Sequence, residues 1–233
     1  MYPEESIQGI TDHRQWWEED DGKTSCRGRL CHAFVPYVFQ TPLTLTPVGR
    51  PNPTEHHEVD AKIEQIRIGQ RNRLRMLPVA ALPLAGEKEL YTVYKAKTRP
   101  CLILGDSWCD LPAEMCQKGR PIFQKTSTVI VAPYFGVSQD GTRAGFPPEF
   151  VDRVRRGMYP QFFWDVLPHS KKESFLFFAH AQPIGKHHDS LDLTKFKLSA
   201  SALTIIDEWL AWYFTGNMPI DGLLYDAREL LLL

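Results

Sequence analysis

Two lysines and an arginine lead directly into an apolar segment, and this pattern could serve phosphate chemistry. Lys95, Lys97 and Arg99 come immediately before Pro100. Residues 101–104, Cys-Leu-Ile-Leu, form a continuous apolar run typical of a strand that is buried on both faces. Such a strand would hold the cationic groups rigidly toward one face, where an arginine fork can grip a phosphate. The alternative is a solvated, basic entry to a strand, and these residues alone leave both interpretations open.

Cysteine and histidine residues offer a second chemistry, metal binding. No two cysteines have the Cys-x-x-Cys spacing that marks a zinc site. In the adjacent pairs His56-His57 and His187-His188, the two side chains would point away from each other in any regular structure. We therefore predict no metal and no cofactor, and we keep a zinc-bound structural protein as the least favoured alternative. The residues on which that alternative depends are Cys26, Cys31, His32, Cys101, Cys109 and Cys116.

The sequence lacks the usual signatures of several large enzyme classes. The sequence has no Gly-x-Gly-x-x-Gly motif, no P-loop and no Gly-x-Ser-x-Gly elbow. With 27 Lys and Arg against 28 Asp and Glu, the net charge is −1, so local basic patches would have to hold an anionic partner. The apolar runs are too short to cross a bilayer and the amino terminus does not resemble a secretory signal. We therefore expect a cytoplasmic protein with no membrane partner.

The apolar pattern predicts a mainly β fold with one long helix. Segments rich in β-branched and aromatic residues predict strands at 28–39, 89–94, 99–104, 126–135, 162–166 and 174–181. Helical spacing of apolar residues predicts a helix over 199–215, with Ser199 capping its start and Gly216 its end. The apolar residues 230–233 must pack on the protein's own body or on a partner.

Composition also suggests how the chain is divided. Residues 1–25 are polar and acidic apart from Trp16-Trp17, and they predict a loosely ordered N-terminal arm whose two tryptophans pack on the body of the protein. The alternative is a peptide that docks on a partner. Residues 26–216 are expected to form a single domain, in which residues 41–89 are an insertion that begins with a proline-punctuated loop. Residues 217–233 form the C-terminal tail.

Several short motifs occur in the order found in the MazF/PemK toxin family, which the chain resembles. Arg99-Pro100 and the apolar strand after it resemble the signature strand of that family. Other resembling segments are residues 27–30 (Arg-Gly-Arg-Leu), 128–133 (Thr-Val-Ile-Val-Ala-Pro), 143–147, 174–182, 198–199 and 206–210. The resemblance covers roughly residues 27–40 and 90–216. It implies a mainly β (α+β) fold: an SH3-like small β-barrel with a C-terminal helix, here carrying a large insertion.

The resemblance also implies a function, the metal-independent cleavage of single-stranded RNA by the toxin of a type II toxin–antitoxin pair. It places Arg99 at the scissile phosphate, where a guanidinium can stabilise the charge that grows in the transition state. A serine or threonine after the next core strand completes the family site, but that position falls on about Tyr134-Phe135. Tyr134, Ser138 and Thr142 are therefore the candidates for this role. The implied partners are single-stranded RNA, a cognate antitoxin peptide or protein, and a second copy in a homodimer.

Basic and aromatic side chains could line an RNA-binding groove, in which bases stack on the rings. The RNA-binding candidates are Lys95, Lys97, Arg143, Arg71, Arg73 and Phe135, with further basic residues at Arg75, Arg153, Arg155 and Arg156 and further rings at Tyr134, Phe146, Tyr159, Phe162 and Phe163. The alternative function is a non-catalytic nucleic-acid- or protein-binding module on the same barrel. The missing serine or threonine after Pro133 favours that alternative.

Overall fold

The computed structural model describes residues 2–11, 16–70, 88–106, 114, 128–139, 145–186 and 189–232. The chain divides into two units, Met1–Phe34 with Thr98–Leu233 and, separately, Val35–Lys97. It passes from one unit to the other within β2 (Arg29–Pro36) and β6 (Ala96–Asp106). The insertion expected over residues 41–89 lies inside the second unit, and residues 71–87 are outside the described part of the chain.

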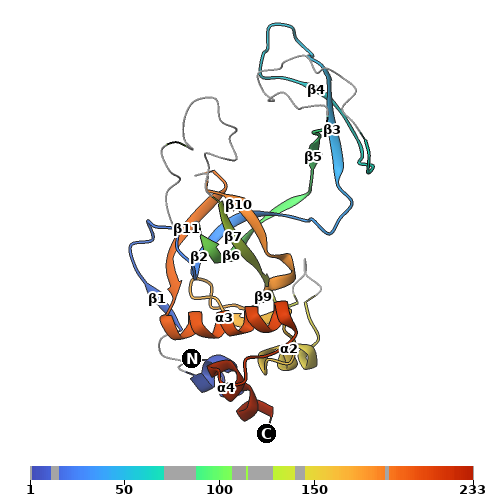
Figure 1. The fold of residues 1–233 in the computed structure, drawn as a ribbon. Helices are drawn as coiled ribbons and strands as arrows, with labels where there is room; N and C mark the ends of the chain where they lie inside the picture. The colour runs from blue at the N-terminus through green and yellow to red at the C-terminus, as the bar shows by residue number, and fades with distance from the viewer. Residues whose placement is uncertain are drawn as a thin grey trace. The chain divides into compact units, whose positions relative to one another are not determined.

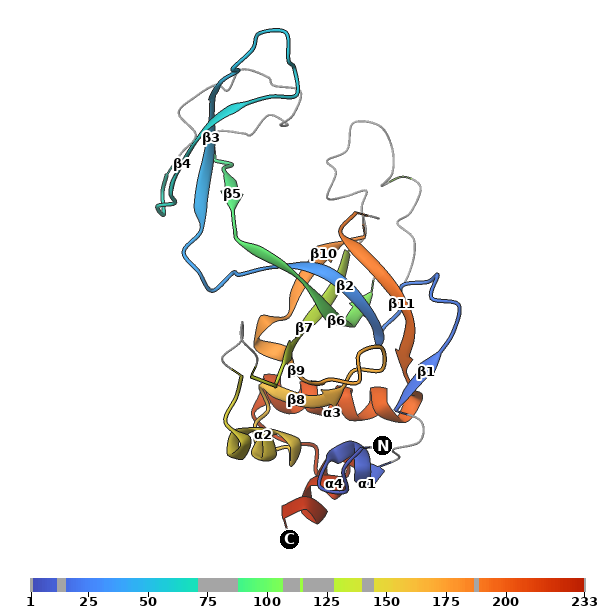
Figure 2. The same ribbon diagram turned by 180° about the vertical axis from the view of Figure 1, so that it is seen from behind.

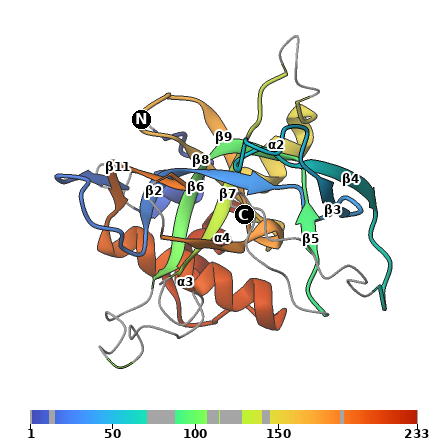
Figure 3. The ribbon, with the colours of Figure 1, turned by 90° about the horizontal axis from the view of Figure 1, so that it is seen from above.

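An antiparallel sheet forms the larger unit, and its central strands are apolar segments that the sequence analysis identified. Its order is β1-β11-β2-β6-β7-β9-β8, and β10 pairs with β7. The remaining strands of this sheet are β1 (Trp17–Glu19), β7 (Thr128–Gly136), β8 (Phe162–Val166), β9 (Glu173–Phe177), β10 (Gln182–Gly185) and β11 (Leu191–Leu198). Figure 3 shows β6 and β7 running side by side through the middle of the sheet.

The expectation of a mainly β fold with a C-terminal helix is confirmed, because two antiparallel sheets are accompanied by short helices and one long one. The sheet path begins at β1 and ends at β8. Over the described residues these two strands do not pair with each other, so the sheet is not closed into a ring.

Helix α3 (Ala200–Thr215) is the predicted long helix, and it lies across one end of the sheet (Figures 1 and 2). The Ser199 hydroxyl accepts a hydrogen bond from the Ala202 backbone N–H, and Gly216 adopts the left-handed conformation with φ +73°. Both caps are those expected from the sequence. Trp209 and the apolar residues beside it on α3 are buried against the sheet, which forms the main core.

Both ends of the chain pack into this core. In the described part of the N-terminal arm, which we expected to be loosely ordered, Ile7 and Trp16 are buried, and Trp16 stacks on Phe163 at 5.6 Å between ring centroids. The C-terminal tail forms α4 (Leu223–Leu232), which lies beside α1 (Ile7–Thr11) below α3 in Figure 1. Leu224 and Leu231 of α4 are buried, whereas Leu230 and Leu232 are exposed. Leu233 lies outside the described residues, so within the tail expected to pack, residues 230–233, only Leu231 is seen to pack on the protein's own body.

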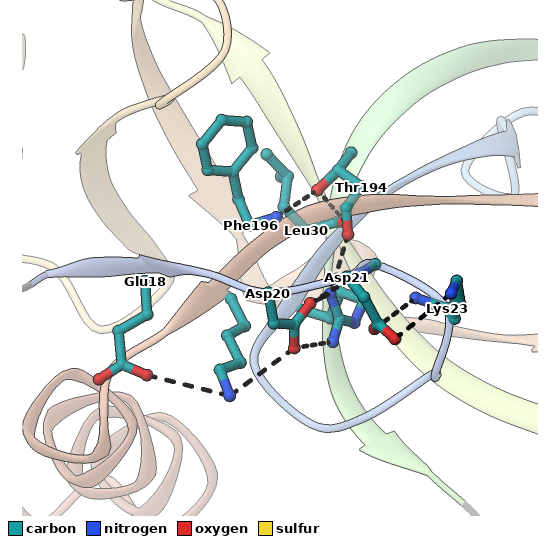
Figure 4. A network of polar contacts seen from close by, with 10 residues as sticks. Glu18, Asp20, Asp21, Lys23, Leu30, Thr194 and Phe196 are labelled. Atoms are coloured by element: carbon teal, nitrogen blue, oxygen red, sulfur yellow. Dashed lines mark hydrogen bonds and ion pairs between the residues drawn. The ribbon is translucent and has the colours of Figure 1, made fainter.

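One acidic residue of the arm, Asp20, is held by a buried arginine, and Figure 4 shows the network of polar contacts around Asp20. Arg29 of β2 is only 1% exposed, and its Nη1 and Nη2 atoms donate to the two carboxylate oxygens of Asp20 at 2.6 and 2.5 Å. Nη1 also donates to the carbonyl oxygen of Thr194 on β11, at 2.9 Å. The Arg29 guanidinium holds the pKa of Asp20 well below its usual range. This ion pair therefore fastens the arm to the sheet.

A second apolar cluster covers part of the other face of strands β7, β9 and β8. Helix α2 (Pro148–Arg155) places Val151 and Val154 against Trp164 and Phe175. Phe175 pairs with Phe135 of β7 on one side and with Trp164 of β8 on the other, so these three side chains share one face. The residues discussed as a functional site lie on this same face.

The second unit contains a three-stranded antiparallel sheet of order β4-β3-β5. Its strands are β3 (Leu43–Gly49), β4 (Asp60–Gln65) and β5 (Tyr91–Val93). Every residue of β4 is exposed, whereas Thr44 of β3 is buried.

Candidate functional site

Arg99 and Phe135 lie opposite each other on two neighbouring strands. The antiparallel register pairs Cys101 of β6 with Pro133 of β7, and two residues further along the same register brings Arg99 to Phe135. The Arg99 guanidinium carbon is 4.2 Å from the centroid of the Phe135 ring, and both side chains are partly exposed. A cation over an aromatic face is attracted by the ring quadrupole, so Phe135 helps to fix the orientation of the guanidinium.

His180 joins this pair from the neighbouring strand connection. The 3-10 turn η3 (Phe178–His180) follows β9 directly and carries His180 back toward the sheet. The imidazole centroid lies 5.6 Å from that of Phe135 and 4.3 Å from that of Phe177. We call Arg99, Phe135, Phe177 and His180 the Arg99 cluster, since each contacts another member and all are partly exposed.

The protonation of His180 is set by its surroundings. Partial burial lowers the pKa of His180, and the positive charge of Arg99 lowers it further. The imidazole is therefore neutral at pH 7, with one nitrogen able to accept a proton. The cluster thus combines a permanent cation, a neutral base and aromatic faces. A guanidinium beside a neutral imidazole can bind a phosphodiester and remove a proton from a group next to it.

Tyr134 lies on the opposite face of β7 from Arg99. Its hydroxyl donates to Asp165 Oδ2 at 3.2 Å, and the Tyr2 hydroxyl donates to Asp165 Oδ1 at 2.8 Å. Tyr134 and Asp165 are buried in the core, and burial raises the pKa of Tyr134 above its usual value. Burial also raises the pKa of Asp165, to about 7. The structure therefore brings Tyr134 together with Asp165 and Tyr2, and not with the Arg99 cluster.

The other candidates from the sequence are dispersed. Ser138 is exposed two residues beyond the end of β7, and Lys95 and Lys97 are exposed residues of the second unit. Thr142, Arg143, Arg71, Arg73 and Arg75 lie outside the described residues. The Arg99 cluster is thus made of Arg99 and Phe135 from the predicted set, together with two residues that the sequence analysis did not single out.

Several further basic and aromatic candidates have structural partners. Arg155 lies over the Trp164 ring at 5.0 Å and pairs with Glu173, while Arg156 pairs with Asp152. Phe163 is 1% exposed and packs against Trp209 in the main core, so it cannot stack on a base. Phe162 and Tyr159 are partly exposed, and Phe146 is 37% exposed.

His180 and Phe177 were missed because residues 174–181 look like one uninterrupted strand. The strand ends at Phe177 instead, and the chain turns through η3. The sequence did contain one signal, because His180 directly follows the apolar residues 175–179, Phe-Leu-Phe-Phe-Ala. A polar side chain at the end of an apolar strand often lies at the exposed edge of that strand.

No group of three or more His, Cys, Asp or Glu side chains that could hold a metal occurs among the described residues. Cys26, Cys31 and Cys101 are free thiols there, and Cys31 Sγ lies 3.5 Å from the carbonyl oxygen of Cys101. Cys109 and Cys116 fall outside the described part of the chain. None of the helices that the structure describes is long and apolar enough to cross a membrane.

Comparisons with known proteins found no relative of this chain. No family model, no curated protein and no solved structure matches the chain. The resemblance to the MazF/PemK family therefore depends on the motifs quoted above, and the functional argument depends on the Arg99 cluster.

Proposed function

We propose that this protein is a metal-independent endoribonuclease of the MazF/PemK type, with Arg99 as the residue that binds the scissile phosphate. The observation that carries the proposal is the position of the Arg99 guanidinium, 4.2 Å from the Phe135 ring and beside the neutral His180. The motif that suggested phosphate chemistry from the sequence thus coincides with a cluster able to perform it. The open eight-stranded sheet, with α3 across one end, is the part of the fold that we assign to the SH3-like barrel.

The reaction is transfer of the phosphoryl group to the neighbouring ribose hydroxyl. The 2′-oxygen forms a bond to phosphorus, and the bond from phosphorus to the 5′-oxygen of the next nucleotide breaks. The products are a 2′,3′-cyclic phosphate and a 5′-hydroxyl end. Arg99 donates hydrogen bonds to the phosphate oxygens, on which negative charge increases in the transition state. Such stabilisation by a fixed donor is commonly worth a factor of about 100 or more in rate.

His180 is the candidate for the proton transfer that the family assigns to a hydroxyl. In this chain the expected hydroxyl position falls on about Tyr134-Phe135. Phe135 has no hydroxyl, and the Tyr134 hydroxyl is bonded to Asp165 on the other face of the sheet. His180 is the titratable member of the Arg99 cluster, and its neutral form can accept the proton of the 2′-hydroxyl as that oxygen attacks. Water supplies a proton to the departing 5′-oxygen.

With this activity, the protein would act in the cell as the toxin of a type II toxin–antitoxin pair. The antitoxin would cover the Arg99 cluster with an extended peptide and so exclude RNA from it. The cluster lies within a single chain, so a second copy in a homodimer is not needed to complete it.

The second candidate function is a nucleic-acid-binding module that keeps the fold and has lost cleavage. The missing serine or threonine after Pro133, where the resemblance requires a hydroxyl, favours it. In that case the protein would bind single-stranded RNA without cutting it.

The deciding experiment is incubation of the purified protein with end-labelled single-stranded RNA in the presence of a chelator. Cleavage with 2′,3′-cyclic phosphate ends is expected from the protein, and Arg99→Ala should abolish it. Arg67→Ala is the matched control, because Arg67 is an exposed arginine of the second unit whose loss removes the same charge. RNA that stays intact with folded, soluble protein would overturn the ribonuclease proposal.

The same proposal can be tested in cells by inducing expression of the protein in a bacterial host. Growth arrest with discrete new RNA ends is expected, and both effects should disappear with Arg99→Ala while Arg67→Ala keeps them. Normal growth at confirmed soluble expression would contradict the role as a toxin.

A further inference from the structure

Strand β4 lies at the edge of the small sheet, and we propose that it pairs antiparallel with β4 of a second copy of this chain. Its neighbour on one side is β3, and among the described residues no strand lies on its other side. Every residue of β4 is exposed. Such an edge offers backbone N–H and C=O groups to another extended segment. The inference goes beyond the proposed function and does not depend on it, because β4 contains no member of the Arg99 cluster.

The residues of β4 alternate in character, so the two faces of the strand differ. Ala61 and Ile63 lie on one face, whereas Lys62 and Glu64 lie on the other. Ile63 is 55% exposed, and the side chains of Lys62 and Glu64 are 64% and 48% exposed. The strand therefore carries an exposed apolar residue on one face and two opposite charges beside it on the other.

On the apolar face, a row of side chains crosses the small sheet and ends at the edge. Leu45 of β3 pairs with Tyr91 of β5 on one side and with Ile63 of β4 on the other. Directly opposite residues share a face, so these three side chains form one row. Tyr91 and Leu45 are partly buried, whereas Ile63 is largely exposed. A further strand beside β4 would remove apolar area of Ile63 from water.

One register of two β4 strands suits both faces. When Ile63 lies opposite Ile63 of the second copy, on a two-fold axis, Lys62 of each copy faces Glu64 of the other. The pairing then joins the two apolar rows on one face and forms two Lys–Glu pairs on the other. A register shift of two residues places either lysine opposite lysine or glutamate opposite glutamate, and a shift of one residue exchanges the faces. The sequence of β4 therefore favours a single way of pairing with itself.

The charges of β4 also interact within one strand. Lys62 Nζ lies 2.8 Å from Glu64 Oε1 of the same copy. In the dimer the four charges would alternate in sign, because each lysine would lie between two glutamates. The competing explanation is that these charges only keep the edge in water, as charged side chains on edge strands often do. The two explanations differ in what a reversal of one charge does to self-association.

The interface lies in the insertion, which the resemblance to the MazF/PemK family does not cover. The resemblance implies a homodimer, but β4 is outside the resembling segments, residues 27–40 and 90–216. A single pair of short strands buries little surface, so the dimer should be weak and should dissociate on dilution.

The experiment is sedimentation velocity of the full chain at low salt over a wide range of protein concentrations. The unchanged protein is expected to show a reversible equilibrium of monomer and dimer, which high salt shifts toward monomer. Lys62→Glu and Glu64→Lys each place like charges opposite one another twice, so each should weaken the dimer by about ten-fold or more. The double variant, Lys62→Glu with Glu64→Lys, restores both pairs and should regain the dimer. Lys23→Glu is the matched control, since Lys23 is an exposed lysine of the first unit.

A mixture of the two single variants gives the sharpest result. Lys62→Glu leaves two negative charges on this face at positions 62 and 64, and Glu64→Lys leaves two positive charges there. In a mixed dimer every negative charge would face a positive one, so equal amounts of the two variants should associate more tightly than either variant alone. A fluorescent label on one variant would measure this association directly.

The outcomes decide the inference separately from the proposed function. A chain that stays monomeric at every concentration would overturn it. A dimer that forms equally well with Lys62→Glu and with Glu64→Lys would use another surface and would also overturn it. RNA cleavage and its loss in Arg99→Ala decide the ribonuclease proposal by a different readout, because Arg99 and β4 belong to different units.

Discussion

The guanidinium of Arg99 lies 4.2 Å from the ring of Phe135, on the face of the sheet opposite to the Tyr134 hydroxyl. Residues 134 and 135 are neighbours in the chain, but the alternation of a strand sends their side chains to opposite faces. One face carries the candidate site and the other carries a buried polar network around Asp165. The two faces give rise to separate predictions, because their titratable groups respond to pH in different ways.

Removal of the Arg99 charge should raise the pKa of His180. The positive charge of Arg99 disfavours a second positive charge on the imidazole and lowers that pKa. In Arg99→Gln, the His180 resonances should therefore titrate at higher pH than in the unchanged protein, as measured by NMR of the imidazole carbons. Assignment follows from the signal lost in His180→Asn. An identical titration in Arg99→Gln would show that the two groups do not interact.

Replacement of His180 should slow cleavage more than it weakens RNA binding. If His180 accepts the proton of the 2′-hydroxyl, His180→Ala should lower the rate of a single turnover by about 100-fold or more. Binding of a non-cleavable RNA should change little, since Arg99 remains. The rate should rise with pH through the pKa of His180, below about 6.5, and then stay level. A variant that keeps this pH profile would assign the proton transfer to another group.

The strands that hold the site could be predicted from the sequence, but the face on which each side chain lies could not. Both β6 and β7 are visible as apolar runs at 99–104 and 126–135. In β7, however, the residues on both faces of the strand are apolar, and the neighbours Val131 and Ala132 are both fully buried. The alternation of residue types therefore does not reveal which face of β7 packs in the main core. Tyr134 was chosen for its hydroxyl, whereas the packing of β7 against the main core determines where that hydroxyl lies.

The position of His180 could not be predicted, for a related reason. Residues 175–179 are all apolar, so nothing marks the end of the strand at Phe177, and the first polar residue after it is His180 itself. The acidic segment at 18–21 was assigned to a loosely ordered arm, because the sequence does not show that Arg29 is buried and requires a counter-charge. Local patterns identified the elements, and long-range packing determined the partners of the polar groups.

Asp165 should make the protein less stable as the pH rises from about 4 to about 7. Burial raises the pKa of Asp165 to about 7, against about 3.9 in an unfolded chain. Between these values the unfolded state is ionised while the folded state holds a proton, so each added pH unit favours unfolding by about 1.4 kcal/mol, and about 4 kcal/mol in all. Urea unfolding of Asp165→Asn should lack this decline. An equal decline in Asp165→Asn would assign it to other groups.

The ion pair of Asp20 should have the opposite dependence on pH. The pKa of Asp20 is held below its unfolded value by Arg29, so this carboxylate stabilises the folded state above an unfolded pKa of about 3.9, and the stabilisation is lost as the pH falls below that value. Asp20→Asn should therefore lower Tm at pH 7, because it leaves the buried Arg29 without its counter-charge. At pH 2 the two proteins should differ much less. Glu55→Gln is the control, since Glu55 is an exposed carboxylate of the second unit. A Tm difference for Asp20→Asn that is the same at both pH values would show that its effect comes from a lost contact rather than from the charge of Asp20.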